Sequence, residues 1–369
     1  MEFSFNGNKK DCQKVYFCTM RSSVSIQNAV LAGCFVVGSL ACFAQSENET
    51  RIAFGSCDNQ EEPQEMWKEI INQKPQLWIW GGDNIYADLE KRIAKKSMYD
   101  KQNANPDYKK LVSLCPITGT WDDHDYGVND GGKFYPQKNE SKELAVDFLG
   151  FSKENPVQKH EGIYNSLVLG QGSQKIKIIN LDTRTFRDTV IKVYYIDSLT
   201  KKRTYKYDPS LTGDVLGEDQ WKWLKEELTN SNSSIFIINS SIQVIPEEHR
   251  FEKWSNFPSA RQRLFNLIIE SKKRILLISG DRHIAEFSKI SLPALSYPLY
   301  EFTSSGITHT WTEPWVELNR YRLGDLVIQK NYGLIKIDWS GEEPKVTLQA
   351  RGLNNSLFAE AVVDFKIGK

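Results

Sequence analysis

An excess of charge of either sign is absent from this sequence. Its 369 residues include 47 basic and 47 acidic side chains, so the formal net charge is zero. Proteins that hold nucleic acid through its phosphates need a basic excess or a basic run. We therefore expect no nucleic-acid-binding surface on this protein.

Cysteine is scarce and is concentrated near the N-terminus. Four of the six cysteines lie in residues 1–44, and only Cys57 and Cys115 follow them. Two cysteines in a chain of this length do not indicate a disulfide framework. A core of this size also needs no such framework to be stable.

The sequence lacks several other features that would define a class. The apolar stretch at residues 29–44 is shorter than the roughly 20 residues that a membrane-spanning helix needs. No tract rich in proline, glycine or serine divides the chain, and no internal repeat occurs. A Gly-x-Ser-x-Gly elbow is missing, which argues against a serine hydrolase. We expect one domain at residues 45–369, with no stable membrane span after signal cleavage.

The N-terminal segment is typical of a secretory signal peptide. Four basic residues precede the apolar stretch, and the small residues Cys42 and Ala44 suit cleavage before Gln45. We therefore expect residues 1–44 to be a signal peptide and the protein to be exported, to the periplasm or beyond the cell. One alternative is a lipoprotein anchored at Cys34, which ends a Leu-Ala-Gly-Cys sequence. Another is an uncleaved anchor.

Apolar strands alternate with amphipathic helices along the rest of the chain. This alternation predicts a layered α/β fold with mostly parallel strands. Residues 129–139 and 188–215 are polar and are predicted to be surface loops. Strands are predicted at 51–56, 77–80, 115–120, 163–169, 175–181, 235–238, 275–278, 300–303, 332–338, 345–349 and 359–365, and helices at 63–72, 88–114 with a break near Asn105-Pro106, 141–151, 216–230 and 258–272.

Potential metal ligands follow the predicted strands directly. Three acidic residues and His124 occupy positions 122–125, at the end of strand 115–120. Carboxylates this close raise one another's pKa unless a cation lies between them. Open α/β sheets build their sites at the carboxyl ends of strands. The other strand-end candidates are Cys57, Asp83, Tyr86, Asp281 and His283.

Each candidate alone has an ordinary structural explanation. An Asp after Gly-Gly is a common turn former, and a cysteine after a strand is usually a small buried hydrophobe. Together, Cys57, Asp83, Tyr86, Asp123, Asp281 and His283 are enough for two metal ions, with Asp122 an open alternative to Asp123. Carboxylates and imidazole suit divalent ions, and a thiolate or phenolate can balance a trivalent one. Two ions roughly 4 Å apart can clamp an in-line displacement at phosphorus.

These motifs, in this order, resemble those of the alkaline phosphatase D (PhoD-like) family of the calcineurin-like metallophosphatases. The resemblance implies a β-sandwich flanked by helices, in four layers (αββα). It also implies ferric iron plus calcium as cofactors, with other divalent ions as alternatives, and places Gln243 near the site. The matching segments are 54–57 (FGSC), 82–88 (GDNIYAD), 121–125 (WDDHD), 181–187 (LDTRTFR), 280–283 (GDRH) and 301–309 (EFTSSGITH).

The expected function is an exported, metal-dependent phosphoric-ester hydrolase in which a metal-bound hydroxide attacks phosphorus. His124 and Arg184 are the predicted catalytic residues, with His124 contacting the phosphate or protonating the leaving oxygen. The substrate would be a small phosphate ester, a lipid or a nucleotide. Alternatives are a phosphodiesterase or phospholipase on the same fold, or a catalytically inactive metal-binding protein. Asp125 and Arg282 depart from the family pattern, which has glutamate and an apolar residue there.

Overall fold

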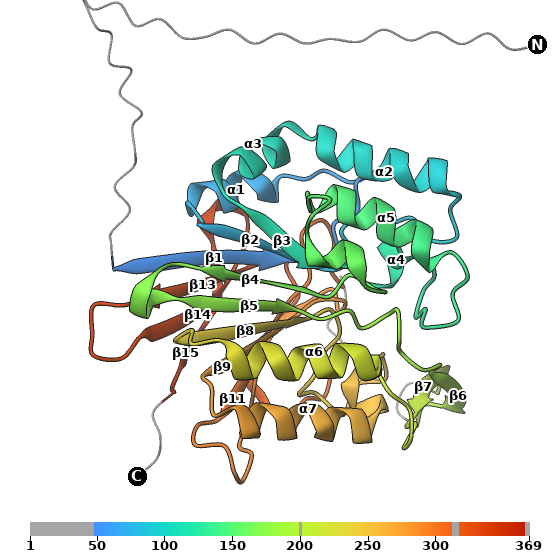
Figure 1. The fold of residues 1–369 in the computed structure, drawn as a ribbon. Coiled ribbons are helices and arrows are strands. Elements are labelled where there is room, and N and C mark those ends of the chain that lie inside the picture. The colour runs from blue at the N-terminus through green and yellow to red at the C-terminus, as the bar shows by residue number, and fades with distance from the viewer. Residues whose placement is uncertain (1–47, 199–200, 312–316, 366–369) are drawn as a thin grey trace, which may run out of the picture. The chain divides into compact units, whose positions relative to one another are not determined.

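Two sheets stacked face to face form the centre of the fold (Figure 1). The computed structural model describes residues 48–198, 201–311 and 317–365, which belong to one compact unit, Gln45–Lys369. In these residues the first sheet has the strand order β15-β14-β13-β1-β2-β3. The second has the order β12-β10-β11-β9-β8-β5-β4.

The elements follow one another along the chain in the order of their numbers within each type. The strands are β1 (Glu49–Gly55), β2 (Leu77–Gly81), β3 (Ile117–Thr120), β4 (Asn165–Leu169), β5 (Ile176–Asn180), β6 (Ile191–Ile196), β7 (Arg203–Asp208), β8 (Ile235–Ser240), β9 (Ile275–Ser279), β10 (Ala285–Ile290), β11 (Leu299–Ser304), β12 (Arg322–Val327), β13 (Tyr332–Asp338), β14 (Lys345–Arg351) and β15 (Leu357–Val363). The α-helices are α1 (Met66–Asn72), α2 (Arg92–Ala104), α3 (Pro106–Leu114), α4 (Asp123–Tyr126), α5 (Lys138–Phe148), α6 (Gly217–Asn230) and α7 (Pro258–Ser271), and the 3₁₀ helices are η1 (Pro156–Lys159), η2 (Gly172–Gln174), η3 (Trp254–Asn256) and η4 (Leu353–Asn355).

Parallel strands form one end of the first sheet and the middle of the second. β1, β2 and β3 run parallel in the first sheet, and β5, β8, β9 and β11 run parallel in the second. The remaining neighbours pair antiparallel. The predicted parallel pairing therefore holds where helices connect successive strands.

Aliphatic side chains fill the space between the two sheets. Ile52 and Ile79 from the first sheet pack with Ile237 and Ile278 from the second, and all four are fully buried. Because strand side chains alternate between the two faces, the residues between these point to the outer layers.

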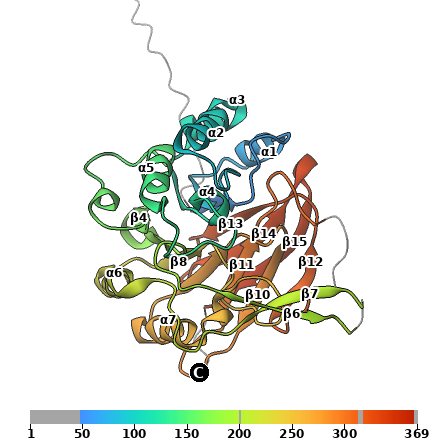
Figure 2. The same ribbon diagram turned by 90° about the vertical axis from the view of Figure 1, so that its right-hand side faces the viewer.

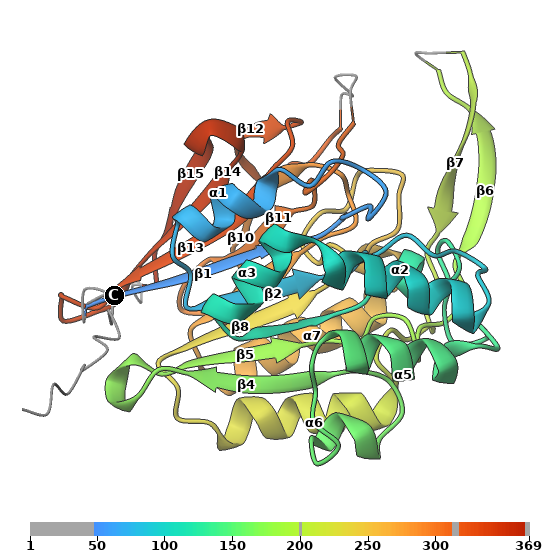
Figure 3. The same cartoon turned by 90° about the horizontal axis from the view of Figure 1, so that it is seen from above.

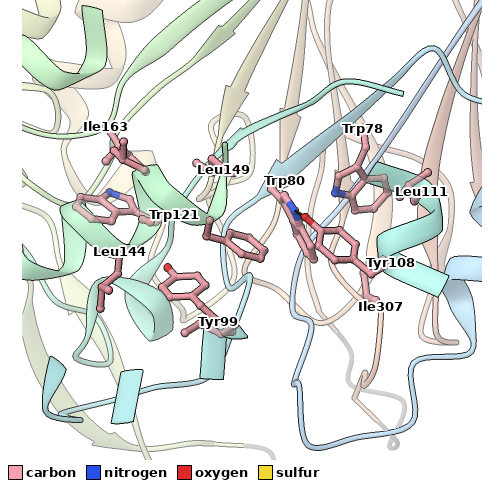
Figure 4. Close-up of a cluster of buried hydrophobic side chains, with 14 of the residues drawn as sticks. Trp78, Trp80, Tyr99, Tyr108, Leu111, Trp121, Leu144, Leu149, Ile163 and Ile307 are labelled. Atoms are coloured by element: carbon pink, nitrogen blue, oxygen red, sulfur yellow. Dashed lines mark hydrogen bonds between the residues drawn. The ribbon is translucent and has the colours of Figure 1, made fainter. Parts of the chain in front are cut away.

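The outer face of the first sheet is packed with aromatic rings. Trp78 and Trp80 of β2 meet Trp67 of α1, with ring centroids 5.1 and 5.3 Å apart. Tyr108 of α3 completes the group, and Figure 4 shows it with Trp78 and Trp80. Edge-to-face packing of this kind adds to the stability gained by burial. On the other side, α6 and α7 cover the second sheet. The predicted four-layer αββα sandwich is confirmed.

Several local predictions were wrong or incomplete. The break in helix 88–114 is confirmed, because Asn105 caps α3 by accepting from the amides of Asp107 and Tyr108, and Pro106 starts that helix. Helices α1 and α5 begin at Met66 and Lys138 rather than at 63 and 141. Strands β10 and β12 and the short helix α4 were not predicted.

The predicted surface loop at 188–215 contains a hairpin. Strands β6 and β7 pair antiparallel with each other and, among the described residues, with no further strand. Figures 2 and 3 show this hairpin projecting beyond the two sheets. No helix of the described residues is long and apolar enough to cross a bilayer. The predicted signal peptide and Cys34 lie outside the described residues.

Candidate metal centre

The carboxyl ends of the central strands meet on one side of the sandwich. β1, β2 and β3 are parallel, and so are β5, β8 and β9, and the arrowheads of β1 and β5 point the same way in Figure 1. The segments that follow these strands therefore converge. This convergence brings together residues that are more than 200 positions apart in the chain.

Four carboxylates form the centre of this region. Asp83, Asp122, Asp123 and Asp281 each place an oxygen within 4.8 Å of the others, and Asp83, Asp123 and His124 form a second such set. Asp83, Asp122 and Asp123 are buried, and Asp281 is half-buried. Four negative side chains at this spacing, away from water, require positive charge nearby.

Two glycines permit the close approach of these loops. A Cβ atom on Gly82 would lie 2.5 Å from Cβ of Asp122, and Gly82 itself has a positive φ of 95°. A Cβ atom on Gly280 would lie 2.4 Å from Oγ of Ser56. Residues with side chains at these two positions would push the strand ends apart.

The backbone of four predicted ligands lies in the left-handed region. Cys57, Asp83, Asp281 and His283 have φ values of 59°, 50°, 66° and 55°. Residues other than glycine adopt this conformation at a cost in free energy, and such residues are concentrated at functional sites. In this protein the strained backbone conformation therefore occurs at positions that bear candidate ligands.

Unpaired polar atoms in this region point to cations. Asp122 Oδ2, Asp123 Oδ1, the Tyr86 hydroxyl and His283 Nδ1 are buried and have no hydrogen-bond partner. Buried polar atoms are normally paired. All four atoms are types that bind metal ions, so the donor set fits the group that the family implies.

The pKa values of the carboxylates reflect their crowding. Burial and neighbouring carboxylates raise the pKa of Asp83 well above its ordinary value, although His124 opposes this. Burial likewise raises the pKa of Asp122 to about 7, against the effect of Arg184. Asp123 is the exception: burial would raise its pKa, but Arg184 and His124 lower it to about 2. A cation among these groups would favour the charged form of each.

Cys57 and Tyr86 adjoin the carboxylate cluster. The Cys57 thiol is fully buried and donates to Asp83 Oδ2 at 3.4 Å. Burial, followed by the charges of Asp83 and Asp281, raises the pKa of Cys57. Burial also raises the pKa of Tyr86, and the adjacent Cys57 adds to this. Cys57 and Cys115 are both free, so no disulfide forms between the cysteines of the described residues.

Aromatic rings line the site next to His283. The His283 ring lies 4.5 Å from the ring of His309 and 5.5 Å from that of Trp311, centroid to centroid. His309 also contacts Tyr86, at 5.0 Å. Burial, followed by the neighbouring His309 and Arg282, lowers the pKa of His283 to about 3, so its imidazole is neutral, as metal binding requires. His309 was not predicted as a site residue, although it ends the motif 301–309.

His124 is held by a second carboxylate. Its Nδ1 lies 2.6 Å from Oδ2 of Asp88, and its ring stacks against Tyr86 at 4.2 Å. Its backbone amide donates to Asp83 Oδ1 at 3.3 Å. Burial alone would lower the pKa of His124, but Asp83, Asp88 and Asp123 raise it to about 11. The imidazole therefore has its orientation and its charge set by carboxylates.

The side chain of Arg184 is completely buried next to the carboxylate cluster. Its Nε donates to Asp122 Oδ1 at 2.5 Å and its Nη1 to Glu252 Oε2 at 2.6 Å. Glu252 also pairs with Arg187, at 2.7 Å. Ser241 donates to the same oxygen of Asp122. The observed contacts of Arg184 thus fix a carboxylate of the cluster, and Glu252 was missed because it is 68 positions away in sequence.

The residues that depart from the family pattern have structural partners. Asp125 accepts from the amides of Asp122 (2.6 Å) and Asn84 (3.2 Å), which caps α4. Arg282 forms a bidentate ion pair with Glu317 at 2.8 and 2.9 Å.

Gln243, which the family resemblance places near the site, has polar partners of its own. It donates to Glu286 (2.7 Å) and Thr303 (2.8 Å), and its Oε1 is buried without a partner.

Comparison with known proteins identifies the family. A family model for PhoD-like phosphatases matches residues 52–331. The solved structure described as PhoD is similar to this fold, with a TM-score of 0.65, 16% identity, and coverage of 85% of this chain and 68% of that one. A dimetal phosphatase from Danio rerio has a TM-score of 0.48 and 8% identity, over 87% of this chain and 100% of its own. No match was found among curated protein sequences. The chain belongs to the PhoD-like phosphatase family, whose members are metal-dependent phosphoester hydrolases.

Proposed function

We propose that this phosphatase is exported and hydrolyses phosphoric esters at the strand-end cluster, with two metal ions held by Cys57, Asp83, Tyr86, Asp123, Asp281 and His283. Asp122 is the alternative to Asp123. The observation that carries the proposal is the set of buried, mutually close carboxylates with unpaired oxygens. Bound cations would favour the charged forms of these carboxylates, which burial and mutual repulsion otherwise disfavour.

The bound ions would supply Lewis acidity at the phosphoryl oxygens and at the attacking water. Asp83 and Asp123 belong to both sets of close ligand atoms, so these two residues are placed to face two ions. The neutral imidazole of His283 serves one ion. Arg184 and Ser241 hold one oxygen of Asp122 and leave the other facing the cluster.

His124 is proposed to act on the substrate rather than on metal. Its ring is 18% exposed and is oriented by Asp88, which stabilises the protonated imidazole. A protonated imidazole can donate to a phosphoryl oxygen or protonate the leaving oxygen. Arg184 contributes by positioning Asp122, because its Nε donates to that carboxylate and its Nη1 to Glu252.

Ferric iron together with calcium is the proposed metal pair. A thiolate and a phenolate at Cys57 and Tyr86 suit a trivalent ion, and carboxylate oxygens suit calcium. Burial raises the pKa of both groups, so binding metal must release their protons. Elemental analysis of protein purified without added metal tests the assignment, and two equivalents of a single divalent ion would contradict it.

Hydrolysis of two aryl esters tests the function. The purified mature protein is expected to cleave nitrophenyl phosphate or bis(nitrophenyl) phosphate, and to lose this activity on chelation. Comparing the two substrates separates phosphomonoesterase from phosphodiesterase activity. A protein that binds metal stoichiometrically but cleaves neither ester would instead be a binding protein on this fold.

Export is the remaining part of the proposal. Residues 1–44 combine basic residues, an apolar stretch and a cleavage sequence. Mass spectrometry of exported material is expected to find a chain that begins at Gln45. A lipid adduct on Cys34 would favour the lipoprotein alternative, and an intact N-terminus would contradict cleavage.

A further inference from the structure

The hairpin β6–β7 exposes apolar side chains on an unusual scale. All six residues of β6 (IKVYYI) are exposed, and Ile191 and Ile196 are each 63% exposed. Soluble proteins rarely leave so many neighbouring apolar side chains in water unless the surface binds something. The hairpin is also a two-stranded sheet, which is only marginally stable alone in water.

One face of the hairpin is anchored to the protein. Cross-strand partners share a face, and Lys192 and its partner Tyr207 both contact Asp130. The Lys192 ammonium also lies over the ring of Tyr205, at 4.8 Å from its centroid. Lys192 and Asp130 are 3.0 Å apart. These contacts fix the base of the hairpin, so the other face is presented in a defined orientation.

On the opposite face the residues of β6 are apolar, and the contact of this face with the rest of the protein is at Thr204, which accepts from Arg250. The β6 residues are Ile191, Val193 and Tyr195, which are 63%, 40% and 39% exposed. Their partners on β7 are Asp208, Lys206 and Thr204, of which Lys206 and Asp208 are exposed as well. We refer to Ile191, Val193, Tyr195 and Lys206 as the outer face of the hairpin.

The charge of the hairpin indicates what it binds. Residues 191–208 contain five basic and two acidic side chains, a local charge of +3 in a chain whose total is zero. Exposed aliphatic and tyrosine side chains together with basic ones are the combination that binds anionic lipid surfaces. We propose that the outer face of β6–β7 docks this phosphatase onto a bilayer containing anionic lipids.

The docked hairpin would bring the metal centre to the lipid surface. Asp130, which holds the hairpin base, donates its own amide to Asp123 Oδ2 at 2.7 Å. Only one residue therefore separates the anchored face of the hairpin from a candidate metal ligand. Docking goes beyond the proposed hydrolysis and is tested without it.

Vesicle co-sedimentation of the mature protein tests the proposal. We expect binding to vesicles of equal parts phosphatidylglycerol and phosphatidylcholine, and little binding to pure phosphatidylcholine. Replacing the apolar residues together (Ile191→Ser, Val193→Ser, Tyr195→Ser) should weaken binding at least tenfold. A matched control, Val168→Ser with Val362→Ser, changes exposed valines on β4 and β15 and should bind like the wild type. Absence of wild-type binding, or equal binding by the triple variant, would overturn the proposal.

A charge-reversal variant tests the same hairpin if the triple variant does not fold. Lys201→Glu with Lys206→Glu alters exposed basic residues and should weaken binding roughly tenfold or more, because each lysine near an anionic surface contributes about a fivefold change. Hydrolysis of a soluble aryl ester should be unchanged in all these variants, which separates docking from catalysis. A wild-type dimer that the triple variant converts to a monomer, without vesicle binding, would mean that this face joins two copies and would overturn the lipid proposal.

Discussion

Strands β2 and β9 differ in burial and charge from the short loops that directly follow each of them. Every residue of β2 and β9 is buried, and their apolar side chains pack against others. Two residues after each strand ends, Asp83 and Asp281 combine an acidic side chain, buried or half-buried, with left-handed backbone. The first arrangement stabilises the fold and the second costs free energy.

This contrast shows where the protein keeps its chemistry. Local sequence preference, packing and hydrogen bonding agree in the strand bodies, as in most stable folds. They disagree at the strand ends, where natural proteins place functional sites. The free energy gained in the sandwich core and the aromatic layer therefore maintains a site that would not hold together alone.

The largest expected effect comes from removing Asp83, one of the two carboxylates shared by both ligand sets. Asp83→Ala should lose metal and lower turnover roughly 10³-fold or more, because polarisation by metal contributes several kcal/mol. Elemental analysis and aryl ester hydrolysis measure the two losses. Asp147→Ala on α5, an exposed aspartate, is the matched control and should change neither. Full metal content and activity in Asp83→Ala would refute the site.

His124→Asn should lower turnover while metal content stays near the wild-type value. Loss of a general acid typically costs roughly 10²- to 10⁴-fold. The loss should be small for nitrophenyl esters, whose leaving group needs no proton, and large for alkyl phosphates. Equal losses on both substrates would exclude the acid role and leave an electrostatic contact, and loss of metal would make His124 a ligand.

A core substitution should lower the stability of the protein without lowering its metal content or turnover. Ile237→Ala on β8 removes a fully buried side chain between the sheets and should lower the free energy of unfolding by about 2–5 kcal/mol. Metal content and turnover of the folded variant should match the wild type, because Ile237 lies in a strand body. Denaturant titration measures the first quantity. Loss of metal at unchanged stability would mean that the two regions are not separate.

The metal-free protein should gain stability when one site charge is removed. Burial and Asp122 raise the pKa of Asp281, so its ionised form is disfavoured without a cation. Asp281→Asn should raise the free energy of unfolding of chelated protein by about 0.5–2 kcal/mol. The same change should destabilise the metal-loaded protein, and calorimetry of both forms makes the comparison. A loss of stability in both forms would mean that Asp281 has a favourable structural role.

The smallest expected effect is a pH dependence of the chelated protein. Burial raises the pKa of Asp122, Asp125 and Glu301 to about 7 each, from ordinary values near 4. Between about pH 4 and pH 7 the native state therefore binds more protons at these groups than the unfolded state. Their contribution to stability should fall as the pH rises through that window. Melting curves with and without metal should show a weaker dependence in the loaded form.

The sequence was informative about residues whose position is set by the strand that directly precedes them. Asp83, Asp123 and Asp281 follow apolar runs, and parallel strands bring their carboxyl ends to one edge, so their proximity could be predicted. The four layers could also be predicted from the motif order. Strand β6 could not, because its apolar residues face water rather than a core.

Long-range pairing was beyond prediction. Nothing in the sequence joins Arg184 to Glu252 or His309 to His283, because those contacts depend on how loops from different strands pack. The short helix α4 was missed for a related reason. It forms where Asp125 accepts from the amide of Asp122, within a segment that would otherwise be read as a turn.

The left-handed backbone at Cys57, Asp83, Asp281 and His283 affects how this protein can be engineered and how related sequences should be interpreted. Glycine adopts this conformation without a side-chain penalty. A library selected for yield or heat resistance alone would therefore favour glycine at these four positions. Such selection would discard the ligands first and return a sturdier protein without metal. Screens of variants of this protein should therefore measure catalysis from the first round. Stable relatives with glycine at these positions are expected to be inactive.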